Sequence, residues 1–400
     1  MKVSRRDLLA GAAGVVALGK TAAMQAVQPT ADPSKVRGKP SRALGQRALS
    51  EKPQRQPRGV ASSGTPHQDL YGTITPADLH FERHHGGVPE IDPKSYSLLI
   101  HGMVERPMVF SLADLKHFPS VSRVHFLECS GNFGGRGTAT DITPQQLAGL
   151  TSTSEWTGVA LATLFREVGA SPKATWFLAE GQDAAVLTRS IPVSKAHDDA
   201  LIAYGQNGEA IRPEQGYPAR LLLPGWEGNA NVKWLRRIEL SDRPFMTREE
   251  TSKYTDPMAD GTARIFSFLM DARSLITYPA FPVTLSRGWI EINGIAWTGS
   301  GKITRVDIST DDGATWTPAK LQQPVLSKAH TRFRHLWNWP GNSEAVIMSR
   351  AVDETGYVQP TRTDLLATRG MSTVGYHFNP VTGWLVRPDG TVVYRTEQWS

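Results

Sequence analysis

The chain has 400 residues, of which 40% are hydrophobic and 20% charged, so it can bury a core and is not disordered throughout. It has one cysteine, which excludes an internal disulfide, a four-thiolate zinc site, a cysteine-ligated iron–sulfur cluster and a c-type haem attached through CxxCH. No apolar run reaches the ~18–20 residues that a membrane-spanning helix needs.

The net charge of +6 is concentrated at the start of the chain. Residues 1–60 hold about 12 Lys and Arg against 3 Asp and Glu, and the remainder is slightly acidic, so we expect no nucleic-acid partner. Residues 1–26 contain the pair Arg5–Arg6 before a modest Ala- and Gly-rich apolar stretch, which is the layout of a twin-arginine export signal. We therefore predict export of the folded protein to the periplasm.

Residues 27–65 are rich in Pro, Arg, Lys, Gln and Ser, which predicts an extended basic arm. This arm is either a solvated tail or a segment that lies along a partner or a second subunit. Residues 66–270 show an α+β pattern without regular βαβ alternation, and we assign them to one domain. Its clearest strands are expected at 97–101, 124–127, 175–179 and 219–223, and its clearest helices at 111–117 and 158–168.

The pattern of hydrophobic residues changes in residues 271–400, which we assign to a β-sandwich of immunoglobulin type. Residues 288–294 and 303–309 alternate with period two, and further short strands are expected at 345–351 and 392–395. Asp311-Asp312-Gly313 lacks the alternate-position carboxylates of a calcium loop, so we expect a hairpin turn there.

Cys129 lies where an apolar strand meets the Gly-rich loop 130–135. A single cysteine is most often a buried structural residue, but this junction also suits a nucleophile or a metal ligand. In a Cys/His hydrolase, the base would come from the upstream histidines His67, His80, His84, His85, His101, His117 and His125.

The segment Phe126–Asn132, with its Cys-x-Gly-Asn pattern, resembles the molybdenum-ligating segment of the sulfite oxidase family. Further matches follow in the order of the family and cover roughly residues 70–400. They are Phe81–His85, Pro89–Asp92, Tyr96–Gly102, Ala203-Tyr204, Asn207-Gly208, Gly216–Arg220, Pro224-Gly225, Asn231–Leu235, Ala351–Asp353, Val358–Pro360 and Arg369-Gly370. The resemblance implies a molybdopterin-binding catalytic domain, followed by an immunoglobulin-like dimerisation domain.

The resemblance also implies roles for individual residues. Cys129 would ligate the molybdenum of a molybdenum–molybdopterin cofactor, and Arg83, Tyr254 and Arg369 would line the substrate site. The pterin and its phosphate would be held by His85, Asp183, Arg220, Asn231, Val232 and Lys233. Arginine, lysine and backbone N–H groups are the donors that a phosphate-bearing cofactor requires.

Two positions depart from the family pattern. A family histidine is replaced by Gln215, and an arginine expected five residues after the cysteine is replaced by Gly134, with Arg136 as the nearest substitute. The sequences of residues 79–85, 225–229 and 246–254 resemble motifs in the molybdenum subunits of bacterial Sox sulfane dehydrogenases. In that group the substrate is a sulfane sulfur on a cysteine of a carrier protein, which suits a less charged pocket.

The resemblance implies oxygen-atom transfer to sulfur, followed by electron transfer to a separate protein, since this chain has no haem-attachment motif. We expect a c-type cytochrome as the acceptor and a homodimer of this chain in a larger complex. Three alternatives remain: a dehydrogenase of free sulfite, a molybdenum reductase that repairs oxidised methionine, and a non-enzymatic extracellular binding protein. The sandwich argues against the reductase, because such enzymes typically lack that domain.

Overall fold

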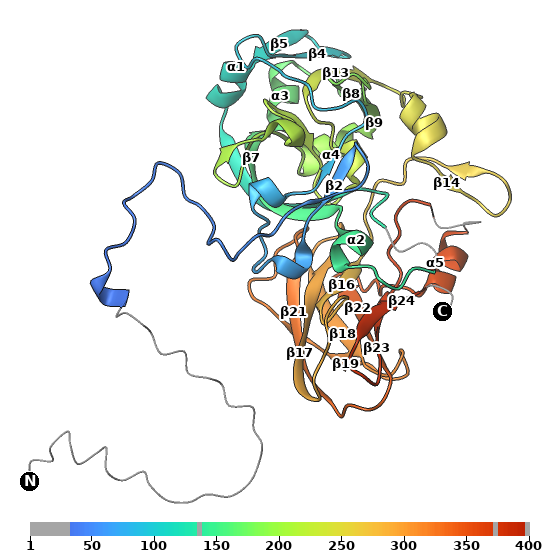
Figure 1. Cartoon of the computed structure of the whole chain (residues 1–400). Helices are drawn as coiled ribbons and strands as arrows, with labels where there is room; N and C mark the ends of the chain where they lie inside the picture. Colours follow the sequence, from blue (N-terminus) through green and yellow to red (C-terminus); the bar gives the residue numbers. More distant parts are fainter. Residues whose placement is uncertain (1–32, 134–137, 371–374, 397–400) are drawn as a thin grey trace, which may run out of the picture. The chain divides into compact units, whose positions relative to one another are not determined.

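A computed structural model describes residues 33–133, 138–370 and 375–396 (Figure 1). The predicted export signal and Arg136 lie outside the described residues. The chain divides into two units, residues 1–52 and 53–400. In the first unit, residues 33–52 are exposed and contain one turn of 3-10 helix, η1 (Pro33–Lys35). Within the described residues, no helix is both long enough and apolar enough to cross a membrane.

Residues 53–65, which we assigned to the arm, belong to the second unit. They form β1 (Gln56–Pro57) and β2 (Ser62–Gly64), and β2 pairs with β3 (Glu82–Arg83). Arg58 fixes this segment, because its Nη2 donates hydrogen bonds to the backbone carbonyls of Gln145, at 2.5 Å, and Gln146. The exposed arm therefore ends near residue 52.

The following domain is built on two sheets (Figure 1). One has the order β11-β10-β7-β6, with β12 also pairing with β10. Its strands are β6 (Ser120–Glu128), β7 (Thr151–Ala160), β10 (Leu201–Gln206), β11 (Glu209–Ala210) and β12 (Arg220–Leu222). The other has the order β5-β4-β13-β8-β9, in which β13 runs parallel to β4. Its strands are β4 (Ser97–Gly102), β5 (Met108–Ser111), β8 (Trp176–Gly181), β9 (Thr188–Pro192) and β13 (Leu235–Ser241).

Short helices connect these strands. They are α1 (Leu112–His117), α2 (Pro144–Ala148), α3 (Leu161–Glu167) and α4 (Val193–Asp198), with the single turns η2 (His67–Asp69), η3 (Ala77–Leu79), η4 (Pro213–Gln215) and η5 (Gly228–Ala230). A π-helical turn, η6 (Glu249–Lys253), precedes the hairpin of β14 (Asp256–Pro257) and β15 (Ala263–Arg264). The predicted helix at 158–168 begins only at Leu161, because residues 158–160 pair with β10.

The C-terminal part is a β-sandwich, as predicted. One sheet has the order β16-β17-β21-β20, and the other β19-β18-β22-β23-β24. Their strands are β16 (Arg273–Tyr278), β17 (Gly288–Trp297), β18 (Ile303–Ser309), β19 (Thr317–Pro318), β20 (Lys320–Leu321), β21 (Thr331–Trp339), β22 (Ala345–Asp353), β23 (Gly383–Val386) and β24 (Val392–Arg395). The Asp-Asp-Gly turn joins β18 to the antiparallel β19, which confirms the hairpin. Helix α5 (Arg362–Arg369) follows β22.

The sandwich shares its core with the preceding domain. Ile292, Trp297 and Phe333 are buried between the sheets, and Phe126 and Leu147 of the preceding domain belong to the same apolar cluster. Burying apolar area continuously across the boundary favours a fixed relation between these two parts of the second unit. The end of β6, which Cys129 follows directly, lies at this boundary.

Candidate functional site

A hollow opens beside Cys129, and we call it the cysteine pocket. Its walls come from strand ends and loops of the α+β domain. Most of the predicted site residues line it, namely Arg83, His85, Cys129, Asp183, Arg220, Asn231, Lys233 and Tyr254. Residues that are more than 160 positions apart in the sequence thus meet at one cavity, which is how a binding site is built from loops on a rigid sheet.

Cys129 follows β6 directly, and its backbone is held on both sides. Its N–H donates to the carbonyl of Leu150 at 2.9 Å, and its carbonyl accepts from the N–H of Asn132 at 2.8 Å. Burial raises the pKa of the thiol, and a hydrogen bond from the Gly131 backbone partly offsets this effect. A thiol in such a place becomes a thiolate most readily when a metal binds it.

Gly228 passes so close to this loop that a side chain cannot be placed there. A Cβ on Gly228 would lie 2.8 Å from the carbonyl oxygen of Glu128 and 3.3 Å from Cα of Cys129. The loop after β12 therefore packs its backbone against the cysteine.

Two cations, the buried Arg220 and the partly buried Lys233, face the pocket without a carboxylate partner. Arg220 donates to the carbonyls of Gln215 and Asn231, each at 2.9 Å, and Lys233 donates to the carbonyls of Arg83 and Glu214, each at 2.8 Å. Neither forms a salt bridge within the described part of the chain. Burial lowers the pKa of Arg220 to about 9 and that of Lys233 to about 7. Two desolvated cations beside one cavity fit a phosphate-bearing ligand that supplies the missing negative charge.

Tyr254 and His85 meet at the rim of the pocket. The Tyr254 hydroxyl lies 3.0 Å from Nε2 of His85, and burial raises the pKa of Tyr254. Desolvation and the neighbouring Arg83 guanidinium lower the pKa of His85 to about 4, so the imidazole is neutral near pH 7. The tyrosine can therefore donate to His85 or to a bound group. Asp183 accepts from the N–H of Leu187 at 3.2 Å, which stabilises a turn in the pocket wall.

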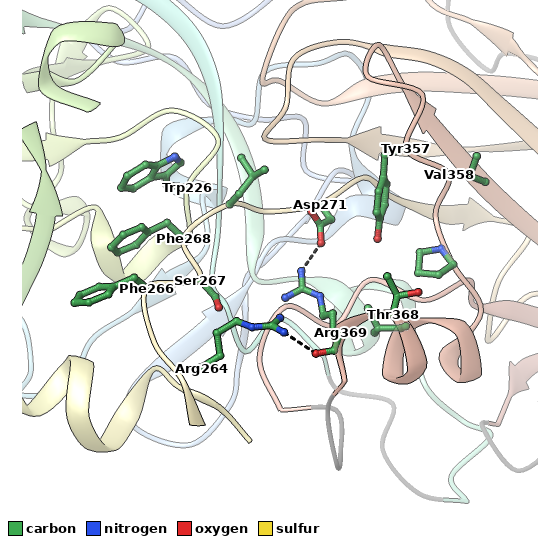
Figure 2. A pocket seen from close by; sticks show the side chains of 13 residues that line it. Trp226, Arg264, Phe266, Ser267, Phe268, Asp271, Tyr357, Val358, Thr368 and Arg369 are labelled. Carbon is green, nitrogen blue, oxygen red and sulfur yellow. Dashed lines mark hydrogen bonds and ion pairs between the residues drawn. The ribbon is translucent and has the colours of Figure 1, made fainter. Parts of the chain in front are cut away.

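The structure places two predicted residues elsewhere. The side chain of Val232 is fully buried in the apolar core of the domain and does not line the cysteine pocket. Arg369 ends α5 and lines a neighbouring hollow, the junction pocket, between the α+β domain and the sandwich (Figure 2). Its guanidinium pairs with Asp271 (Figure 2). It also lies 3.7 Å from the carboxylate of Asp256.

The junction pocket has an aromatic wall and a charged wall that face each other (Figure 2). Trp226 stacks on Phe268 with ring centroids 4.4 Å apart and planes 2° apart. Opposite them, Arg264 donates to the backbone carbonyl of Arg369 at 2.9 Å. Trp226, for which the sequence suggested no role, is thus a wall of this second hollow.

A buried ionic network between the two pockets was not predicted from the sequence. Arg189 bridges Glu250, at 2.8 Å, and Glu227, at 2.9 Å, and Glu227 also faces Nε2 of His377 at 3.3 Å. Burial alone would raise the pKa of Glu227, but Arg189 and His377 hold it below its usual range. These residues come from four segments of the chain, and no local pattern in the sequence indicates that they meet. Glu227 alone falls within a segment singled out from the sequence, residues 225–229.

Residues 85–249 match the family model "Oxidoreductase molybdopterin binding domain", and residues 265–383 match "Mo-co oxidoreductase dimerisation domain". The structure is similar to that of the sulfane dehydrogenase SoxCD from Paracoccus pantotrophus, with 43% identity, a TM-score of 0.81 and coverage of 92% of this chain and 99% of that chain. This chain belongs to the sulfite oxidase family of molybdenum oxidoreductases. It is therefore a molybdopterin-dependent oxidoreductase, and the predicted family, fold class and cofactor are confirmed.

Family members with longer chains are also similar. Human mitochondrial sulfite oxidase is 30% identical over 337 residues, which cover 76% of this chain and 61% of the human protein. An NADH nitrate reductase from Ulva prolifera is 30% identical over 345 residues, which cover 75% of this chain and 39% of that protein. The chain thus spans less than two thirds of the length of these relatives.

Proposed function

We propose that this chain is the molybdenum-bearing component of a periplasmic sulfane dehydrogenase. Its substrate is sulfane sulfur attached to a cysteine of a carrier protein, as in the oxidation of thiosulfate and sulfur. The observation that carries the proposal is the similarity to SoxCD, which spans 99% of that chain at 43% identity. Free sulfite is the second candidate substrate, supported by the 30% identity to human sulfite oxidase.

The residues of the cysteine pocket fit the family cofactor. Cys129 supplies one soft thiolate ligand for molybdenum, and the unpaired cations Arg220 and Lys233 hold the phosphate of the pterin. Asn231 is buried beside them, with Nδ2 bonded to the Glu227 carbonyl at 2.9 Å, so it fixes the loop that presents Gly228. When bound, the cofactor supplies oxygen-atom transfer to sulfur and takes up two electrons.

The polar residues of the pocket orient the substrate. Arg83 offers a guanidinium to the oxygen atoms that sulfur gains, and the Tyr254 hydroxyl, placed by His85 at 3.0 Å, donates a hydrogen bond to the same oxygens. We assign Arg136 the role of the missing family arginine at Gly134. Arg369 lies one pocket away and is already paired with Asp271, so we assign it to the substrate approach.

The electrons leave through a second protein. The sequence has one cysteine and no haem-attachment motif, which favours a separate c-type cytochrome as acceptor. The dimerisation-domain match in residues 265–383 supports a homodimer within the complex. The twin-arginine pattern at Arg5–Arg6 supports export of the folded chain.

Turnover measurements decide between the two substrates. The loaded enzyme is assayed with free sulfite and with a persulfide on the carrier protein, using ferricyanide as electron acceptor. We expect turnover of the carrier-bound persulfide and slow turnover of sulfite. Fast and specific turnover of sulfite without a carrier would overturn the sulfane assignment and leave the family assignment intact.

A further inference from the structure

The residue before Cys129 is a buried carboxylate held by three side chains. Glu128 accepts hydrogen bonds at Oε1 from Nη1 of Arg273, at 3.0 Å, and Nδ2 of Asn132, at 2.9 Å. Its Oε2 accepts from Nε1 of Trp297 at 2.6 Å. Glu128 and Arg273 are each no more than 2% exposed, so this is an ion pair in a dry interior.

Two of the three donors belong to the C-terminal sandwich. Arg273 is the first residue of β16 and Trp297 the last of β17, and the two stand directly opposite each other in the antiparallel register. One cross-strand pair of the sandwich thus reaches the end of β6 in the other domain. Arg273 Nη1 also donates to the backbone carbonyl of Asn132 at 2.7 Å.

The C-terminal part holds the same loop at two further points. The N–H of His377 donates to the carbonyl of Ser130 at 2.9 Å. The rings of Phe133 and Phe378 stack with centroids 3.5 Å apart and planes 23° apart. The C-terminal part therefore contacts residues 128–133 at both ends and in the middle, and Cys129 lies within this segment.

Stability alone does not account for a charged pair at this position. Replacing a buried ion pair by apolar side chains of similar size is often neutral or stabilising, because both charges must lose their hydration. The pair instead fixes the geometry of the loop, because one nitrogen of Arg273 donates both to the Glu128 side chain and to the Asn132 backbone carbonyl. Hydrogen bonds of this kind around a metal ligand fix its orientation and tune the metal.

The geometry points to Arg273 and Trp297 as positioning residues for the metal ligand. The sandwich fixes the backbone that presents the Cys129 thiol, so the catalytic site is completed by the domain that the family model describes as a dimerisation domain. This inference rests on Cys129 as the ligand of molybdenum, and it is independent of which sulfur compound is oxidised.

The first test removes the ion pair as a unit in the loaded, full-length enzyme. Glu128→Gln combined with Arg273→Met leaves no unpaired buried charge, so we expect a folded protein that is more stable than Arg273→Met alone, in which Glu128 stays charged and loses its partner. We expect kcat to fall roughly 10- to 100-fold at little-changed KM. The electron paramagnetic resonance spectrum of the centre, recorded after partial reduction with dithionite, should shift.

A second, milder pair of variants separates positioning from stability. Trp297→Phe removes the bond to Glu128, whereas Trp384→Phe removes a comparable buried bond, from Nε1 to the Ile276 carbonyl at 3.1 Å, that does not reach the cysteine loop. Both should lower the unfolding temperature, Trp297→Phe by more because its bond is to a carboxylate. Only Trp297→Phe should shift the spectrum and reduce kcat several-fold.

Wild-type spectra in Trp297→Phe would overturn the inference, whether or not the double variant folds. Because dithionite replaces the natural substrate, this result does not depend on whether sulfite or sulfane sulfur is oxidised. If the purified wild-type protein contained no molybdenum, the proposed function would be wrong, whatever the variants show.

Discussion

The desolvated Lys233 predicts a measurable dependence of stability on pH. Its pKa is lowered from 10.5 to about 7 in the folded chain, chiefly by burial. Between these values the unfolded chain binds one more proton than the folded chain, so the free energy of unfolding rises with pH. The slope is about 1.36 kcal/mol per pH unit, which amounts to about 2 kcal/mol between pH 7.5 and pH 9.

The experiment compares Lys233→Met with the wild type, both as full-length chains made without the cofactor. Urea unfolding at pH 7.5 and pH 9 gives the two free energies of unfolding. Methionine does not titrate, so the advantage of the variant at pH 7.5 should shrink by about 2 kcal/mol at pH 9. Other groups titrate alike in both proteins and cancel in the difference. The exposed Lys173→Met serves as the control and should follow the wild type at both pH values.

Parallel pH curves for the wild type and Lys233→Met would refute this reasoning, because they would mean that Lys233 stays charged in the folded chain without an anionic ligand. In the enzyme with its cofactor bound, Lys233→Met should be destabilising instead of stabilising. The phosphate of the cofactor pairs with the charged lysine, so the variant should retain less molybdenum after gel filtration than the wild type.

Three further outcomes follow from the site. Cys129→Ala should fold but contain close to no molybdenum by metal analysis, whereas retained molybdenum would exclude this residue as the ligand. Arg189→Met leaves Glu227 and Glu250 buried without their shared partner and should lower the free energy of unfolding by about 3–5 kcal/mol. Arg369→Gln breaks its pairing with Asp271 and should cost about 1–3 kcal/mol in urea unfolding. A higher KM at unchanged kcat would fit a role in the substrate approach, whereas an equal fall in kcat and kcat/KM would place Arg369 in the chemistry instead.

Local patterns predicted those elements whose side chains alternate or end in a recognisable cap. Strand β18 lies where the period-two pattern placed it, and β24 coincides with the short strand expected at 392–395. Ser111 caps α1 with a reciprocal bond to Asp114, as a capping box requires. The polar run Thr151–Ser154 gave no such signal, yet it is a buried part of β7. Its hydroxyls find partners on remote segments, for example Thr151 on the Leu127 carbonyl at 3.0 Å.

The site residues were predictable for a different reason. The resemblance in sequence identified Cys129, Arg220 and Lys233, and the structure brings them to one cavity. It did not indicate which side chains face that cavity, so Val232 proved to be a core residue and Arg369 a residue of the next pocket. Contacts such as Arg273 with Glu128 span 145 positions and leave no local trace in the sequence.

The parallel pairing of β4 with β13 has a consequence for the order of folding. Ile100 pairs with Ile238, so the sheet that begins near residue 97 is incomplete until the chain has been made beyond residue 241. The loop around Cys129 is fixed later still, because Glu128 is held by Arg273 and Trp297, and Phe133 stacks on Phe378. Pairings this distant impose a large loop-closure entropy and slow folding. A chain still emerging from the ribosome thus has no finished site, and the cofactor can be enclosed only after almost the whole polypeptide has been synthesised.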